Sequence, residues 1–103
     1  MFKKGRFKYG NPNYSSVDII RGDSIQKELG GNMGNQIYKI DWTSDCSYNL
    51  IPKKMSDERL KEKVGSVLHV QIIDILSSRS YVYRSTADFK KWATYGIITL
   101  VDQ

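Results

Sequence analysis

The sequence is poor in the residues that cross-link small folds or bind metals. Its 103 residues include one cysteine, one histidine and two prolines. A single cysteine excludes an intramolecular disulfide, and one cysteine with one histidine excludes the zinc frameworks that need several of them. We therefore expect no metal and no cofactor, and a fold that is stabilised by its own core.

Long apolar runs are also missing, since no stretch approaches the roughly 18 apolar residues of a membrane-spanning helix. Residues 1–10 are basic, but no apolar segment follows them, so they lack the pattern of a secretory signal peptide. Taken literally, this predicts a cytoplasmic protein, whereas a trimmed mature form would belong to the cell envelope. The lone Cys46 is compatible with either compartment.

What the sequence does contain is enough to form one globular domain. Hydrophobic residues make up 40% of the chain and charged residues 26%, which excludes a disordered protein. The length predicts a single domain over residues 1–103. Sixteen basic residues against eleven acidic ones leave a net charge of +5, which keeps nucleic acid among the partners to consider.

Alternation of apolar and polar residues between turn-forming segments predicts an all-β protein. We expect an antiparallel meander of seven or eight strands that forms a small lipocalin-like barrel or a sandwich. In the first strand the alternation places Phe7 and Tyr9 on one face and the basic residues on the other. The strands are predicted near residues 4–9, 16–21, 24–29, 36–43, 46–52, 66–76, 80–86 and 96–102.

Two segments interrupt the alternation. The charged stretch 52–65 predicts a short helix near 56–64, with Ser56 as N-cap and Gly65 after its last turn. Leu60 and Val64 of this helix would face the sheet. A second helical turn is expected at 86–93, with Thr86 as its cap.

Few residues suggest catalysis. Cys46 and His69 are the only candidates for a thiol–imidazole pair, but Cys46 lies in a strand-like pattern that favours a small buried residue. The acid pairs Asp41/Asp45 and Asp18/Asp23 cannot be placed across a cleft. The Gly30–Gly34 segment is expected to be a hairpin connection and not a phosphate cradle, because a strand follows it and no Lys-Ser/Thr is present.

The first strand combines basic and aromatic residues, as strands of small nucleic-acid-binding barrels do. Lys4, Arg6 and Lys8 are the candidate contacts. However, single-strand binding needs aromatic rings beside the cations, whereas alternation puts Phe7 and Tyr9 on the opposite face. We keep a cytoplasmic single-stranded nucleic-acid binder as the alternative function.

Aromatic residues elsewhere have two readings. Tyrosines and tryptophans in a small barrel either fill the core or line a ligand cavity. Because the predicted strands are short, we favour filling. The aromatic residues concerned are Tyr38, Trp42, Tyr48, Tyr81 and Tyr83.

The last strand, Ile97–Val101, offers an open edge, so the chain is expected to be a monomer or an edge-strand dimer.

The segment Trp42–Leu50 carries a pattern found in a known group of proteins. It resembles small bacterial β-proteins of the lipoprotein type, of unassigned activity, with a Trp-x-x-Asp-Cys-x-Tyr-x-Leu signature. Similar residues occur at 4–9 and at Arg21-x-Asp23-Ser24-x-Gln26, so the resemblance covers about the first half of the chain. Such proteins carry an export or lipoprotein signal with a lipid-modified cysteine before the first strand, where this sequence has Met1-Phe2-Lys3. The resemblance implies no catalytic residues.

The signature predicts a structural role for its residues. We expect a tight hairpin or bulge at Asp45 and Cys46, with Trp42 and Tyr48 packed in one core layer. The Asp45 carboxylate would accept hydrogen bonds from the turn backbone. The sequence as a whole favours a non-enzymatic binding or interaction domain, as a trimmed envelope lipoprotein, with an unknown protein or small ligand as its partner.

Overall fold

A computed structural model describes residues 2–14, 16–31, 34–55, 66–87 and 92–102. These ranges contain eight strands and one short 3-10 helix. In chain order the elements are β1 (Gly5–Tyr9), η1 (Pro12–Tyr14), β2 (Asp18–Arg21), β3 (Ile25–Leu29), β4 (Gln36–Ser44), β5 (Ser47–Met55), β6 (Leu68–Ile75), β7 (Ser80–Ala87) and β8 (Thr94–Asp102).

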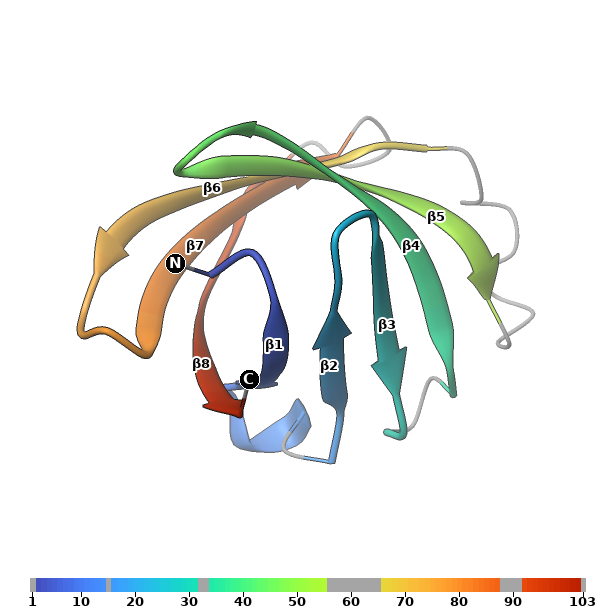
Figure 1. Ribbon diagram of the computed structural model, residues 1–103, viewed down its shortest axis with the longest axis horizontal. Helices are drawn as coiled ribbons and strands as arrows, with labels where there is room; N and C mark the ends of the chain where they lie inside the picture. The colour runs from blue at the N-terminus through green and yellow to red at the C-terminus, as the bar shows by residue number, and fades with distance from the viewer. Residues whose placement is uncertain (1, 15, 32–33, 56–65, 88–91, 103) are drawn as a thin grey trace.

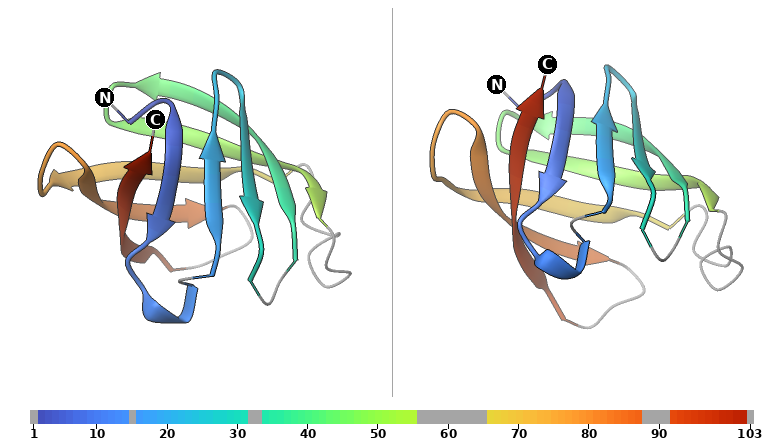
Figure 2. Two further views of the ribbon diagram at one scale, coloured as in Figure 1. Left: turned by 60° about the horizontal axis from the view of Figure 1, so that its bottom comes forward. Right: turned by 90° about the horizontal axis from the view of Figure 1, so that it is seen from below.

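The strands form a closed antiparallel barrel in which each strand pairs with its neighbours in the sequence (Figure 1). β8 pairs with β7 on one side and with β1 on the other, which closes the sheet. The predicted all-β meander is therefore confirmed, as a barrel and not a sandwich. β8 lies between β7 and β1 (Figure 2), so the open edge expected at Ile97–Val101 is absent, because both edges of β8 are hydrogen-bonded within the barrel.

Five of the strands are longer than a typical short meander strand. β4 to β8 each have eight or nine residues. β5 extends to Met55, past the predicted end at residue 52, although Pro52 lies within it. Proline is tolerated there because the pairing of β5 with β4 shifts at that point, next to Tyr38.

The predicted helices fall largely outside the described ranges. The helix near 56–64, with Ser56, Leu60 and Val64, lies wholly outside the described residues. The second helical turn, at 86–93, lies partly outside them. Its expected cap, Thr86, belongs to strand β7, so that part of the expectation is wrong.

Alternating residues of the strands fill the barrel in two layers. One layer is centred on Phe7, Ile19 and Tyr81, which have no exposed surface. The other contains Tyr38, Ile40, Tyr48, Leu50 and Val70, and Trp42 and Tyr83 contact both layers. The predicted orientation of Phe7 and Tyr9 in β1 is thus confirmed, and buried apolar residues alternate in the same way along β4, β6 and β8.

A buried arginine occupies one end of the barrel, which we call the closed end. Arg21 is 3% exposed and donates hydrogen bonds from Nε to Gln26 Oε1, from one terminal nitrogen to Phe2 O and Tyr81 Oη, and from the other to Tyr48 Oη. Its guanidinium also lies 4.5 Å from the ring centre of Phe7 and 4.9 Å from that of Tyr48. Hydrogen bonds and ring faces together replace the water that this cation loses on burial.

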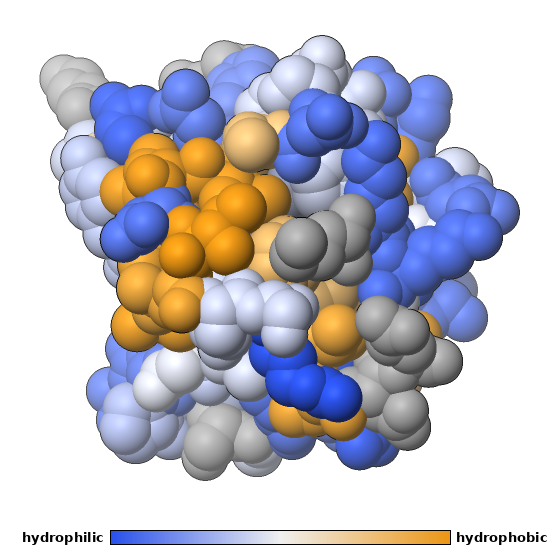
Figure 3. Space-filling view, turned by 60° about the vertical axis from the view of Figure 1, so that its left-hand side comes forward, coloured by the Kyte–Doolittle hydropathy of each residue, from blue (hydrophilic) through white to orange (hydrophobic). Residues whose placement is uncertain are grey.

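The outer surface carries an apolar patch on one side of the barrel. Ile73, Ile75, Leu76 and Ile97 are 41–51% exposed, and Ile97 pairs with Val82 across β7 and β8. Figure 3 shows apolar side chains gathered on this side of the molecule. In the described part of the chain, no helix has the length and apolar character needed to span a membrane.

We expect Arg21→Met to lower the free energy of unfolding by about 2–4 kcal/mol. The substitution removes four buried hydrogen bonds and leaves their acceptors buried without a donor. Guanidinium chloride unfolding measures the change. Arg6→Met, on the exposed face of β1, is the matched control and should change stability by less than about 0.5 kcal/mol. Equal effects of the two substitutions would show that Arg21 does not hold the closed end.

Candidate ligand cavity

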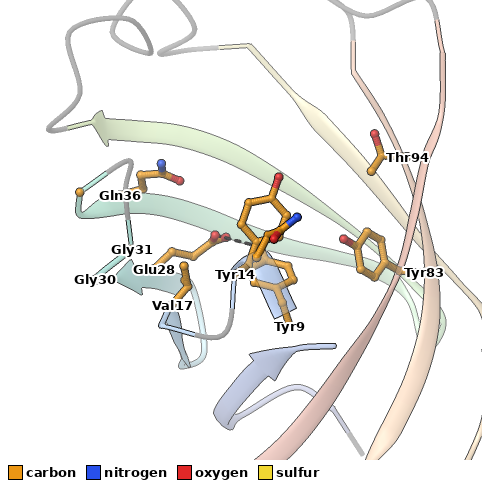
Figure 4. Close-up of a pocket in the computed structure, with 11 residues that line it drawn as sticks. Tyr9, Tyr14, Val17, Glu28, Gly30, Gly31, Gln36, Tyr83 and Thr94 are labelled. Carbon is orange, nitrogen blue, oxygen red and sulfur yellow. Dashed lines mark hydrogen bonds between the residues drawn. The ribbon is translucent and has the colours of Figure 1, made fainter. Parts of the chain in front are cut away.

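The end of the barrel opposite Arg21, which we call the open end, is hollow. It contains a cavity of about 270 Å³ and, deeper in the barrel, a second one of about 170 Å³. Tyr9, Glu28, Tyr83 and Thr94 line both, so the two cavities are adjacent. Figure 4 shows Glu28 and Tyr9 meeting on one side of the outer cavity, with Tyr83 and Thr94 facing them.

Two loops shape the mouth of the outer cavity. Helix η1 contributes Asn13 and Tyr14, and the connection between β3 and β4 contributes glycines. Gly30 and Gly31 have φ angles of 82° and 79°, a region that other residues rarely adopt. A Cβ atom on Gly30 would lie 2.8 Å from Ser16 O, so the loop packs closely on the neighbouring connection. The Gly30–Gly34 segment is thus a hairpin connection, as expected.

Glu28 is the carboxylate among the described residues that line these cavities. It is 9% exposed, and its two carboxylate oxygens accept hydrogen bonds from Tyr9 Oη at 2.9 Å and from Gln26 Nε2 at 3.0 Å. Burial raises the pKa of Glu28, and the bonds from Tyr9 and Gln26 and the charge of Arg21 oppose that rise without cancelling it. Gln26 therefore joins the carboxylate to the guanidinium, because its amide oxygen accepts from Arg21.

Tyrosines form much of the remaining wall. Burial, with the nearby Glu28 carboxylate, raises the pKa of Tyr9 well above its usual value, and the same causes raise the pKa of Tyr83 to about 12. Tyr38 donates a hydrogen bond to Gln36 at 2.6 Å. Tyr83 lies over the backbone of Gly96, where an added Cβ would come within 2.7 Å of its hydroxyl oxygen. These hydroxyls are neutral at any physiological pH.

The aromatic residues therefore do not simply fill the core. Tyr48 and Tyr81 do so at the closed end, where their hydroxyls are 2.9 Å apart. At the open end Tyr83 borders empty space, so the filling that the short predicted strands favoured does not extend to that end. The expectation relied on strands of five to seven residues, whereas β4 to β8 have eight or nine.

Sequence reasoning missed the buried polar residues. Arg21, Gln26 and Glu28 are buried, and the sequence patterns had not predicted this for any of them. One feature of the sequence indicates that Arg21 is buried, because the two-residue period of a strand places it on the same face as Ile19. Gln26 lies directly opposite Arg21 across the β2–β3 hairpin.

The basic residues of the first strand lie outside the barrel and are separated from its aromatic residues. Lys4 pairs with Asp23 at 2.8 Å, and Lys8 pairs with Asp18 at 3.0 Å. Arg6 is exposed. Phe7 is buried, and the Tyr9 hydroxyl reaches Glu28 inside the barrel. The structure thus does not bring Lys4, Arg6 and Lys8 together with the rings of Phe7 and Tyr9 on one surface. Lys3, just before β1, lies 5.6 Å from the ring centre of Trp42.

Cys46 and His69 are not part of the cavity. Cys46 is exposed at the turn between β4 and β5, against the expectation of a small buried residue. His69 Nδ1 lies 2.9 Å from Asn49 Oδ1 on the outer face of the barrel. Within the described ranges, no three His, Cys, Asp or Glu side chains gather closely enough to hold a metal ion.

The β4–β5 hairpin has the predicted shape. Trp42 pairs with Tyr48, their ring centres are 4.6 Å apart, and the pairing shifts between Trp42 and Ser44. The predicted role of Asp45 is wrong, however. Its side chain is 97% exposed and meets only Lys3 among the described residues, at 3.5 Å. Ser44 Oγ accepts the hydrogen bond from Cys46 N instead.

Comparison with known proteins adds nothing to this geometry: neither family models, nor curated proteins, nor solved structures match the chain.

We expect Asp45→Ala to change the free energy of unfolding by less than about 0.5 kcal/mol, because an exposed ion pair contributes little. Ser44→Ala should cost about 0.5–1.5 kcal/mol, since it removes the acceptor of the turn amide. Chemical unfolding of the two variants measures both values. A larger loss in Asp45→Ala than in Ser44→Ala would contradict this assignment.

The raised pKa of Glu28 makes the stability of the protein depend on pH. Because the folded state binds this proton more tightly than the unfolded chain, the group's contribution is complete below the ordinary carboxyl pKa and is lost as pH rises through the raised value. The denaturant midpoint of unfolding should therefore fall in the wild type as pH rises through the raised pKa of Glu28. The Glu28→Gln variant should not show this fall. Asp41→Asn, an exposed residue of β4, controls for the loss of one charge. Parallel curves for wild type and Glu28→Gln would contradict the pKa assignment.

Proposed function

We propose that this protein is a small-molecule-binding barrel whose ligand enters at the open end. The observation that carries the proposal is a buried carboxylate, Glu28, that borders a cavity open to the surface. Burying a carboxylate costs stability. A fold whose only task was stability would gain from an apolar residue at this position, so the charge is more easily explained by a ligand.

The shape of the space supports the same function. Ligand pockets typically have volumes of about 300–1,000 Å³, with mostly apolar or aromatic walls and a few placed polar groups. The outer cavity, at about 270 Å³, is close to this range, and the inner one lies next to it. Its walls combine tyrosine rings with Glu28, Gln36 and Thr94. A ligand of the size of one substituted ring suits these dimensions.

Single-stranded nucleic-acid binding has less support. It would require the first-strand cations to bind phosphate beside exposed rings. Lys4 and Lys8 are engaged by Asp23 and Asp18, and Phe7 is inside the barrel. The cavity is the better candidate for the binding site.

Titration with 2-phenylethanol, a neutral probe of suitable size, tests the proposal. We expect the probe to shift the backbone amide resonances of Val17, Gly34 and Gln36 at the mouth, and to leave those of Asp45 and Arg79 unchanged. Two-dimensional amide NMR spectra measure both the location and the dissociation constant. Shifts confined to the closed end, or no saturable shift, would contradict the proposal.

A pair of variants on β8 sharpens this test. Thr94→Phe places a ring in the space that Thr94 lines and should weaken probe binding at least about tenfold, which corresponds to 1.4 kcal/mol. Val101→Phe adds a ring of the same size on the exposed face of the same strand and should leave binding unchanged. Equal affinities in the two variants would place the probe elsewhere.

A further inference from the structure

We propose that the open-end cavity selects an organic ammonium ion, a protonated amine with a small apolar substituent, over neutral or anionic molecules of the same shape. This inference rests on the proposed function, because it names the chemical class of the ligand for the same cavity. It follows from the hydrogen-bonding capacity of the walls, from the ring faces and from the positions of the charged side chains.

The carboxylate of Glu28 retains capacity to accept hydrogen bonds. An ionised carboxylate offers about four lone-pair positions. Tyr9 and Gln26 each occupy one of them in the structure. The remaining positions belong to a group that borders both cavities. An ammonium group, which has only donors, is a natural complement to them, and a charge-assisted hydrogen bond of this kind is stronger than a neutral one.

The tyrosine hydroxyls add to this acceptor-rich character. A phenol has one hydrogen to donate, and Tyr9 donates it to Glu28 while Tyr38 donates it to Gln36. With those hydrogens in use, the two oxygens can only accept from a ligand. A carboxylate or phosphate ligand would therefore face acceptors on several sides, which is unfavourable, whereas a donor ligand would not.

The rings provide a second favourable interaction for a cation. Tyr9, Tyr14 and Tyr83 line the outer cavity, and Tyr38 lines the inner one. The ring centres of Tyr9 and Tyr14 are 5.9 Å apart in an edge-on arrangement, so the two rings form a corner beside Glu28. Aromatic walls with a carboxylate attract ammonium groups through the negative faces of the rings.

Basic side chains do not compete for Glu28 inside the cavity. Among the described residues that line the two spaces, none is lysine, arginine or histidine. Arg21 reaches Glu28 only through Gln26, from the closed end. The chain carries a net charge of +5, so selection of a cation would come from these local groups and not from the overall field.

The same geometry couples binding to the protonation of Glu28. The titratable or charged groups around it are Tyr9 of β1, Arg21 of β2 through Gln26, Tyr38 of β4 and Tyr83 of β7. An ammonium ion favours the ionised carboxylate. The affinity for an amine should therefore fall as pH is lowered through the raised pKa of Glu28, while the affinity for an alcohol should not follow this decline.

Three probes with the same ring and chain length test the inference: 2-phenylethylamine, 2-phenylethanol and phenylacetate. Amide NMR titrations of the full chain at neutral pH measure the three dissociation constants. We expect the amine to bind at least about tenfold more tightly than the alcohol, and phenylacetate at least about tenfold more weakly than the alcohol, since charged hydrogen bonds differ from neutral ones by this order.

Variants identify the group responsible. In Glu28→Gln the ratio of amine to alcohol affinity should fall to about one, whereas Asp41→Asn, which removes one charge from the outer face, should retain the wild-type ratio. If Glu28→Gln does not fold, the pH dependence of the amine-to-alcohol ratio in the wild-type protein provides the same test.

The outcomes separate the two proposals. An amine-to-alcohol ratio near one in the wild type, or a high ratio that Glu28→Gln or low pH leaves unchanged, overturns the selection of ammonium while the cavity remains a ligand site. Failure of all three probes to bind at the open end overturns the proposed function, and the inference with it.

Discussion

The burial of one guanidinium group organises this barrel. Arg21 cannot lose its charge at any physiological pH, so its position inside the fold requires acceptors and ring faces around it. Those partners come from the N-terminal segment and from strands β1, β3, β5 and β7, which ties distant parts of the chain together at the closed end. Gln26 continues the arrangement along the barrel axis, because its amide accepts from Arg21 and donates to Glu28. The carboxylate at the open end is thus held by the cation at the closed end.

The two ends of the barrel differ in how completely their inward-facing side chains fill them. Phe2, Tyr48 and Tyr81 fill the closed end, together with Arg21. At the open end tyrosines line the walls and leave space between them, and Gly96 leaves room for the ring of Tyr83 to lie against the backbone. The fold thus leaves space beside a carboxylate that has acceptor positions to spare. Packing at one end and space at the other support a binding function better than a purely structural one.

The sequence predicted the fold well and the candidate site poorly, for related reasons. Alternation located the strands because Phe7, Ile98 and similar residues face the core of any barrel. The same rule assigns polar residues to solvent, so it gives no hint that Glu28 faces a cavity. That assignment depends on a hydrogen-bond partner, Tyr9, which is 19 residues away in the sequence and comes near Glu28 only when β1, β2 and β3 have assembled. Asp45 illustrates the opposite error, since a nearer acceptor, Ser44, satisfies the turn.

Closure of the barrel by β1 and β8 also bears on how the chain folds. Every other strand pair joins neighbours in the sequence, so those pairs can form as local hairpins while the rest of the chain is still disordered. Closure joins residues about ninety positions apart, such as Phe7 and Leu100. The entropy of bringing such distant segments together exceeds that of a ten-residue hairpin by only about 2 kcal/mol, because this cost grows with the logarithm of loop length. A chain emerging from the ribosome can therefore build most of its sheet early, but the barrel closes only when β8 is released.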